Sequence, residues 1–565
     1  MRLLLVWSAD PAGGYGWMPP ARPGDIVVSF DLLAAEELAS RQPLRFDDLL
    51  SWEDRSAAEH QVSRILAAVH ASPALASQKL EGHKLADFAD YRLRAEFASV
   101  LRGWAAGRAA QGCTEMISDP GTPAALVIGA RAALGLDVEA TPYTVAAPPV
   151  VPSGPRRAVA RAQMRTLAAA SRSDKVRVVA VMAAKVVPAL SALTRDELRA
   201  AGIGTAPFPG LDYGNSARLA VRLRVPMLLT LDPARPRAVP RPQTDGRLRL
   251  DDDPALDRAL CRVTTGLIEQ AWPQFVAAVA ATRGLERARN LRALLLPTSA
   301  VGASQVLMGW ARRHGVAVAV VQHGVYGFRE FDGGDRRADV LFAWSPAVER
   351  QGSAWVKPRP RIVPVGVPGM PHARARAAPA AVHHVLVATT GRPLESALSQ
   401  AAFHQWFIEA VTPGLRRLVE EGVVVELRLH PAEEAGPYRR SLAAAGLGVP
   451  IASPIPLDQA VAQTDVLVCA PSSVAFEAAA LGAPILLWNS AMPAEIRREH
   501  LVPPWGEDLP GTFDDAPGFS TLVEGLLAAG TPAMRTGADL ARRLAMYAEP
   551  FDAARFSAGL LELAR

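Results

Sequence analysis

The residues best suited to chemistry lie in the C-terminal half, each group directly after a short apolar run. Gln322, His323 and Gly324 follow the run 316–321. Histidine has an unperturbed pKa of about 6.5, so near neutral pH it can take a proton from a hydroxyl group. The glycine allows a sharp backbone turn. We expect His323 to act as a general base, with Gln322 and Gly324 beside it in a cleft. The alternative is a histidine that only bonds to a loop carbonyl.

A second group closes the apolar run 423–429. It consists of Arg428, His430 and Pro431. Proline lacks a backbone N–H and so ends the ladder of a strand, which would hold the histidine on a rigid corner. An imidazole N–H can donate to a phosphate oxygen, and arginine adds a permanent positive charge. We expect all three residues to take part in phosphate binding. An arginine at a strand end can instead be only a solvated ion-pair partner.

The third group joins the apolar run 466–470 to a helical stretch, 474–481. Ser472 and Ser473 stand between them. The start of a helix presents free N–H groups and the positive end of its dipole, so it can bind an anion. One serine can simply cap the helix. Glu477 comes one helical turn after Ser473, where its carboxylate could accept hydrogen bonds from ribose hydroxyls. Its alternative is a glutamate whose partners lie within the helix.

Two further segments carry polar residues near predicted elements. Asp10, Gly13 and Gly14 follow the first apolar run and could let the backbone approach an acceptor molecule. Residues 251–253 form an Asp-Asp-Asp run that superficially resembles the Asp-x-Asp of metal-dependent transferases. Because a helical pattern starts at Pro254, we interpret this run as a capping turn and expect no metal site.

The elements that must position these residues follow an alternating pattern. Short runs rich in Val, Ile and Leu alternate with longer helical stretches, which is typical of an α/β fold with buried parallel strands. Ligands bind at the carboxyl edges of such sheets. We expect strands at 3–7, 25–30, 115–118, 176–182, 294–296, 316–321, 340–344, 361–365, 385–388, 424–429, 449–452, 466–470 and 485–488. The expected helices include 57–70, 87–106, 302–314, 393–421, 457–463 and 474–481.

Taken together, the three groups resemble the GT-B glycosyltransferases that build bacterial surface and capsule polysaccharides. The CDP-glycerol glycerophosphotransferases and the bacterial sialyltransferases and polysialyltransferases are similar in their motifs. The resemblance covers about residues 293–488 and implies two Rossmann-like, doubly wound domains that face each other across a cleft. We expect an acceptor-side domain with insertions at 1–370, a nucleotide-donor domain at 371–535 with the hinge near 369–381, and C-terminal helices at 536–565 that pack back on the domains.

The resemblance also implies roles for individual residues. His430, Pro431, Ser472 and Ser473 would hold the nucleotide and its phosphate, His323 would be the base, and Glu477 would bind the ribose. The implied reaction is metal-independent and needs no cofactor. It transfers a sugar or polyol phosphate from a nucleotide-activated donor, CMP- or CDP-linked, to a hydroxyl of a lipid-linked or polymeric glycan.

The sequence departs from parts of the pattern. The acidic-acidic-Gly signature of sialyltransferases has only near misses, at 53–55 and 332–335, which argues against sialyl transfer. The paired glutamates of retaining GT-B enzymes are also absent, because Cys469 and Ile485 stand eight residues either side of Glu477. Two alternatives remain: an enzyme like the UDP-sugar 2-epimerases, or a non-catalytic protein that binds a glycan or nucleotide.

Composition limits which partners and which cellular compartment we expect. The 565 residues carry 61 basic and 56 acidic side chains, a net charge of +5, which is too small to favour nucleic acid as a partner. The cysteines, Cys113, Cys261 and Cys469, lie too far apart for a disulfide framework or a zinc cluster. With no export signal and no long apolar run, we expect a cytoplasmic protein that meets a membrane only peripherally, at its inner face.

Overall fold

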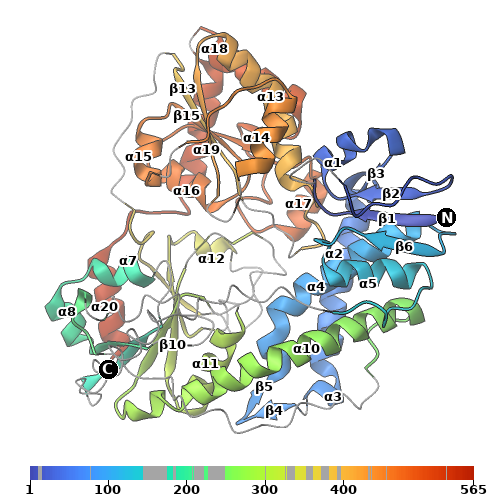
Figure 1. Cartoon of the computed structure of the whole chain (residues 1–565). Helices are drawn as coiled ribbons and strands as arrows, with labels where there is room; N and C mark the ends of the chain where they lie inside the picture. The colour runs from blue at the N-terminus through green and yellow to red at the C-terminus, as the bar shows by residue number, and fades with distance from the viewer. Residues whose placement is uncertain are drawn as a thin grey trace.

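The computed structural model confirms the α/β class, with helices packed around parallel sheets. Two parallel sheets and a two-stranded antiparallel sheet of β4 (Lys79–Leu80) and β5 (His83–Lys84) lie within residues 1–370, and a third parallel sheet lies within 384–513. Helices cover the faces of the parallel sheets (Figure 1). The structure describes the chain except for residues 10–14, 77, 144–174, 182–185, 207, 209–219, 221, 227–247, 299–300, 323, 325, 328–337, 352–359, 371–380, 391–395, 431–432, 434, 453–454 and 530.

The N-terminal unit, residues 1–135, contains a four-stranded sheet. Every residue of strand β1 (Arg2–Val6), with the sequence RLLLV, is buried, and the run from Leu3 to Val6 is wholly apolar. Such continuous apolar runs are characteristic of parallel strands covered on both faces. The strand order is β3 (Leu44–Arg45), β2 (Ile26–Ser29), β1 (Arg2–Val6) and β6 (Glu115–Ser118).

The second sheet has six parallel strands. Their order is β12 (Arg361–Pro364), β11 (Val340–Ala343), β10 (Ala317–Val321), β9 (Ala293–Leu296), β7 (Val178–Ala180) and β8 (Ile203–Thr205). The order reverses between β7 and β9, which makes that position the topological switch point of this sheet.

The C-terminal unit, residues 381–549, is built on a five-stranded parallel sheet. Alternate residues of its central strand enter different cores: Val387 packs with Phe407 of one cluster, and Leu386 packs with Phe476 of the other. This two-residue period is what a strand covered on both faces requires. The strand order is β14 (Val424–Arg428), β13 (His384–Ala388), β15 (Val466–Cys469), β16 (Ile485–Trp488) and β17 (Thr512–Phe513), with the switch point between β13 and β15.

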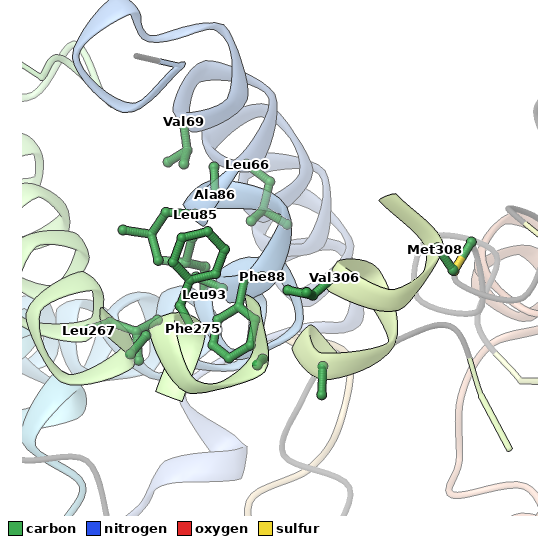
Figure 2. Close-up of a cluster of buried hydrophobic side chains, with 14 of the residues drawn as sticks. Leu66, Val69, Leu85, Ala86, Phe88, Leu93, Leu267, Phe275, Val306 and Met308 are labelled. Carbon is green, nitrogen blue, oxygen red and sulfur yellow. The ribbon is translucent and has the colours of Figure 1, made fainter. Parts of the chain in front are cut away.

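A layer of helices joins the two N-terminal sheets. Their apolar faces meet in one large cluster, in which the Phe88 and Phe275 rings lie 5.4 Å apart (Figure 2). The helices are α2 (Trp52–Ala71), α4 (Leu85–Ala109), α5 (Ala124–Ala133), α10 (Pro254–Thr282) and α11 (Gly302–Arg313). Among the helices that the structure describes, none combines the length and apolarity needed to cross a bilayer.

The remaining helices lie mainly in the C-terminal unit. They are α13 (Phe403–Glu420), α14 (Ala435–Ala444), α15 (Leu457–Ala462), α16 (Ser473–Ala480), α17 (Ala494–His500), α18 (Ala516–Leu527), α19 (Pro532–Ala545) and α20 (Ala553–Leu563). Shorter helices in the other parts of the chain include α1 (Leu32–Glu37), α3 (Pro73–Ala76), α7 (Val186–Ser191), α8 (Arg195–Ala200) and α12 (Val348–Gln351).

Helix α2 begins at Trp52, five residues before the expected start at 57, and two other expected elements differ more from the structure. Helix α13 begins at Phe403, ten residues after the expected start, because the carboxylate of Asp47 accepts hydrogen bonds from the Ala401 and Ala402 N–H groups and holds a turn there. The expected strand at 449–452 is only a single bridge, between Ile451 and Leu427. It lies beyond the edge strand β14 and forms no regular ladder.

The end of the chain returns from the C-terminal unit to the six-stranded sheet. Val367 forms a parallel bridge with Pro550, and the neighbouring Gly366 has φ +79°. A Cβ atom at Gly366 would lie 2.1 Å from the Pro550 carbonyl oxygen, so only glycine fits this crossing. Helix α20 then packs on the sheet, where Phe556 contacts Phe342 edge to face.

Candidate functional site

Three neighbouring strands of the five-stranded sheet bring sequence-predicted residues to one edge. Ala388 at the end of β13 pairs with Arg428 of β14 on one side and with Cys469 of β15 on the other. His430 and Ser472 therefore follow strands that flank β13 on either side. This edge also lies at the switch point of the sheet, the position at which open α/β sheets bind ligands.

A hydrogen-bonded corner fixes the chain after β14. The His430 N–H lies 2.9 Å from the Thr389 hydroxyl and 3.0 Å from the Glu433 carboxylate, and the Glu433 N–H donates back to the His430 carbonyl at 2.9 Å. Thr389 donates its hydroxyl to Glu433, and Tyr438 donates to the same carboxylate at 2.5 Å. Burial, together with the charge of Glu433, raises the pKa of Tyr438, which keeps its phenol a donor. The His430 backbone is thus held while its side chain is exposed.

Arg428 occupies the last position of β14 and is half-buried. Its guanidinium donates to the carbonyl of Ile455 at 2.9 Å, across to the loop that leads into α15. The side chain therefore fastens a loop of the C-terminal unit and keeps further N–H donors. Pro431, expected beside His430, lies outside the described residues.

The two serines stand where the sequence places them, at the start of α16. Ser472 is the N-cap residue and has an extended backbone, but its hydroxyl makes no capping hydrogen bond. This buried oxygen has no hydrogen-bond partner among the described residues. Ser473 is the first helical residue, and Glu477 lies one turn later; both are half-buried. Buried polar groups are normally paired, so this hydroxyl, without a partner among the described residues, is available to a ligand atom or a water.

The turn after β10 is fastened by the side chain of Gln322, which is 2% exposed. Its amide nitrogen donates to the Gly324 carbonyl at 2.9 Å, and its amide oxygen accepts from the Trp344 N–H at 2.9 Å. The Trp344 indole N–H donates to the Gln322 carbonyl at 2.8 Å. Both ends of the Gln322 amide are therefore occupied within the protein. His323 lies outside the described residues.

Trp344 links this turn to the C-terminal unit. The indole is fully buried and belongs to the hydrophobic cluster that contains Leu386 of β13 and Phe476 of α16. Helix α16, which begins at the serines, and Trp344, which is bonded to the 322–324 turn, therefore belong to one hydrophobic core. In Figure 1, α16 lies on the side of the C-terminal unit nearer to the six-stranded sheet.

The other sequence candidates have structural roles or lie outside the described residues. Asp253 caps α10, accepting from the Ala255 and Leu256 N–H groups at 2.8 and 3.2 Å, as the capping interpretation predicted. Asp54 forms a capping box with Ser51 at the start of α2. Asp10, Gly13 and Gly14 lie outside the described residues.

Sequence reasoning missed three residues of this edge: Thr389, Glu433 and Tyr438. Thr389 directly follows β13, so the strand-end reasoning applied to β14 and β15 could have found it. Glu433 and Tyr438 form no motif that reveals their contact. The importance of Trp344 also depends on contacts between distant segments, which the sequence does not display.

The chain was compared with protein families, curated proteins and solved structures. No family model matches the chain, and no curated protein matches it. A putative UDP-N-acetylglucosamine 2-epimerase from Listeria monocytogenes is 11% identical, with a TM-score of 0.40, 68% of this chain covered and 94% of that one. MurG of Acinetobacter baumannii is 12% identical, with a TM-score of 0.39 and coverages of 68% and 99%. The wall teichoic acid polymerase TagF is 11% identical, with a TM-score of 0.36 and coverages of 72% and 93%. Likenesses at this level do not assign the chain to a family.

Proposed function

We propose that the chain is a GT-B-like glycosyltransferase that depends on a nucleotide-activated donor. It transfers a sugar or polyol phosphate, from a CMP- or CDP-linked donor, to a hydroxyl of a lipid-linked or polymeric surface glycan. One observation carries this proposal: the buried Ser472 hydroxyl, which has no partner among the described residues, stands at a helix start on the switch-point edge of a parallel sheet, two strands from His430. Helix starts at such edges bind phosphate groups.

The donor phosphate would lie between α16 and the corner after β14. The N–H groups at the start of α16 and the Ser472 hydroxyl would contact its oxygens from one side. His430, whose backbone is fixed by Thr389 and Glu433, would reach it from the other. These donors stand in place before the reaction, so they would stabilise the charge that builds on the departing nucleotide at little reorganisation cost. The proposed reaction then needs no metal.

The base in this mechanism is His323. Its two neighbours, Gln322 and Gly324, are joined by a hydrogen bond, and Trp344 ties Gln322 to the core shared with α16. A turn fastened in this way would hold the imidazole steady next to the donor site. His323 would take the proton from the acceptor hydroxyl as that oxygen attacks the activated carbon or phosphorus of the donor.

Donor binding is tested by thermal unfolding with a panel of CMP-, CDP-, UDP- and GDP-activated donors. A ligand that binds only the folded chain stabilises it by about 2.7 kcal/mol at 100 times its dissociation constant. We expect a cytidine donor to raise the Tm of the wild type and to raise it much less in His430→Ala. Ser99→Ala serves as the control, because that hydroxyl donates to the Ala95 carbonyl of its own helix, away from the proposed donor site. Equal shifts in His430→Ala and in the control contradict the phosphate assignment.

Catalysis is tested separately with His323→Ala. A transferase loses turnover by a factor of roughly 10² to 10⁴ when its general base is removed, while donor binding survives. A non-catalytic binding protein shows no turnover to lose. An epimerase would convert the donor sugar without any acceptor, so omission of the acceptor distinguishes that activity from transfer.

A further inference from the structure

A cluster of metal-ligand side chains lies between two helices that are far apart in sequence. His60 projects from α2 of the N-terminal unit, and Glu499 and His500 end α17 of the C-terminal unit. Figure 1 shows the two helices where these units meet, and direct hydrogen bonds join them. One ligand atom from each of the three residues lies within 4.8 Å of the other two.

The separations suit one small cation. His60 Nε2 lies 2.8 Å from one carboxylate oxygen of Glu499, and His500 Nε2 lies 3.9 Å from the other. Zinc binds histidine nitrogen and carboxylate oxygen at about 2.0–2.2 Å in a tetrahedron, which places neighbouring ligand atoms about 3.4 Å apart. The observed distances lie on both sides of that value. Small rotations of the two exposed side chains would therefore bring all three ligands to one ion.

The surroundings also fit such a site. The His500 side chain is completely buried, and the Ser56 hydroxyl lies 2.8 Å from its Nε2 atom. The His60 and Glu499 side chains are 52% and 48% exposed, so an ion can enter from solvent. The centroids of the two imidazole rings lie 4.9 Å apart, so the rings are neighbours across the junction of the two helices.

We propose that His60, Glu499 and His500 bind one zinc ion, which fastens the N-terminal unit to the C-terminal unit. Two nitrogen ligands and one carboxylate are the donor set that zinc prefers, whereas magnesium and calcium prefer oxygen ligands alone. A water molecule, or the Ser56 oxygen, would take the fourth position. The ion binds only when the two helices are together, so it stabilises the assembled chain. This inference does not depend on the proposed transferase activity.

The test is competition for zinc between the full chain and a coloured chelator. We expect the wild type to bind one zinc ion with a micromolar or lower dissociation constant. His60→Ala and Glu499→Gln each remove one ligand from an exposed side chain, so both variants fold, and we expect their affinity to fall at least about 10-fold. Millimolar magnesium should not displace the zinc.

The matched control is His70→Ala. His70 also lies on α2 and has carboxylate partners, but Asp90 faces one ring nitrogen at 2.6 Å and Asp87 faces the other at 3.5 Å, so its carboxylates do not converge on one ion. Zinc should raise the Tm of the wild type and of this control, and leave that of His60→Ala unchanged. Zinc affinity that is equal in the wild type and His60→Ala, or lost equally in the control, overturns the proposal, as does displacement by magnesium.

Discussion

At the scale of single residues, the edge of the five-stranded sheet contains two hydroxyl groups in opposite situations. The Ser472 hydroxyl has no partner among the described residues, whereas the Thr389 hydroxyl bonds to His430 and Glu433. We predict that Ser472→Ala leaves the free energy of unfolding within about 0.5 kcal/mol of the wild type, while Thr389→Val lowers it by about 1–3 kcal/mol. Urea unfolding measures both.

The same pair of variants separates ligand binding from stability. Ser472→Ala should weaken donor binding although the fold is intact, because the proposed phosphate site loses one hydrogen-bond donor. A large loss of stability in Ser472→Ala, with unchanged donor affinity, would mean that the hydroxyl serves the fold and not a phosphate.

A buried histidine supplies a prediction about pH. Burial, assisted by the charge of Arg313, lowers the pKa of His83 to about 4, and Arg313 donates a hydrogen bond to its Nε2 atom. The unfolded chain, with a pKa near 6.5, then binds more protons than the folded chain between about pH 4 and 6.5. The His83 contribution is therefore complete above pH 6.5 and is lost as the pH falls towards 4.

The urea midpoint at pH 7.5 and at pH 5.0 checks this prediction. We expect the midpoint to fall between these pH values in the wild type and to fall less in His83→Gln, which cannot take up the proton. If His83→Gln shows the same dependence as the wild type, the buried imidazole does not govern the acid response.

The sequence was most informative about residues that follow strands. The positions of His430, Ser472 and Ser473 after strands could be predicted, because a proline and a pair of serines are strong local signals for the end of a strand. Glu433 was not predicted, since its value comes from accepting three hydrogen bonds at once, including one from Thr389 on another strand. Local patterns report what a residue can do, but not which distant group it meets.

At the scale of elements, α4 and α5 make the closest helix crossing in the part of the chain that the structure describes. A Cβ atom at Gly103 would lie 1.8 Å from the Leu126 carbonyl oxygen, and one at Gly129 would lie 2.1 Å from the Val100 carbonyl oxygen. Both glycines are needed because the helix backbones touch. We predict that Gly103→Ala lowers the free energy of unfolding by about 1–3 kcal/mol, since the added methyl must push the helices apart.

The control for this prediction is Gly436→Ala in α14. A Cβ atom there would meet nothing within 4 Å, so the substitution should be neutral or should stabilise the helix by about 0.5 kcal/mol. Thermal unfolding of the two variants gives the comparison. A neutral Gly103→Ala would show that α4 and α5 can separate freely.

The bounds of elements were predicted well where apolar residues recur at a regular spacing. They were predicted badly where contacts with distant segments set the end of the element. The expected strand 115–118 has the observed bounds of β6, and the expected helix 302–314 differs from α11 by one residue. The start of α13 was ten residues wrong because Asp47, more than 350 residues away, fixes the turn before it. No local propensity carries that information.

At the scale of the whole molecule, a buried ionic network joins the N-terminal and C-terminal units. Glu59 of α2 is 1% exposed and accepts hydrogen bonds from Arg94, from the Ser396 hydroxyl and from the Ala397 N–H at 2.7–2.8 Å. Arg102 donates to the Ser396 carbonyl in the same turn. The sequence could not indicate this junction, because its partners are separated by almost 340 residues.

This junction gives a prediction for the assembled chain. Glu59→Gln keeps the shape of the side chain but removes its charge. Arg94 then loses its counter-ion, and the new amide NH₂ group faces an N–H or O–H donor where a carboxylate oxygen accepted before. Breaking a buried pair on one side costs about 3–5 kcal/mol. Glu59 also accepts from Ser396 and Ala397 of the C-terminal unit, so the substitution weakens the contact between the units as well. We therefore expect calorimetric unfolding to separate into two transitions, the lower one releasing the turn at 396–402 to proteolysis. Glu53→Gln is the control, since Glu53 is exposed on the same helix and should unfold like the wild type. A single transition at the wild-type temperature in Glu59→Gln would show that the hydrophobic core around Trp344, and not the ionic network, holds the units together.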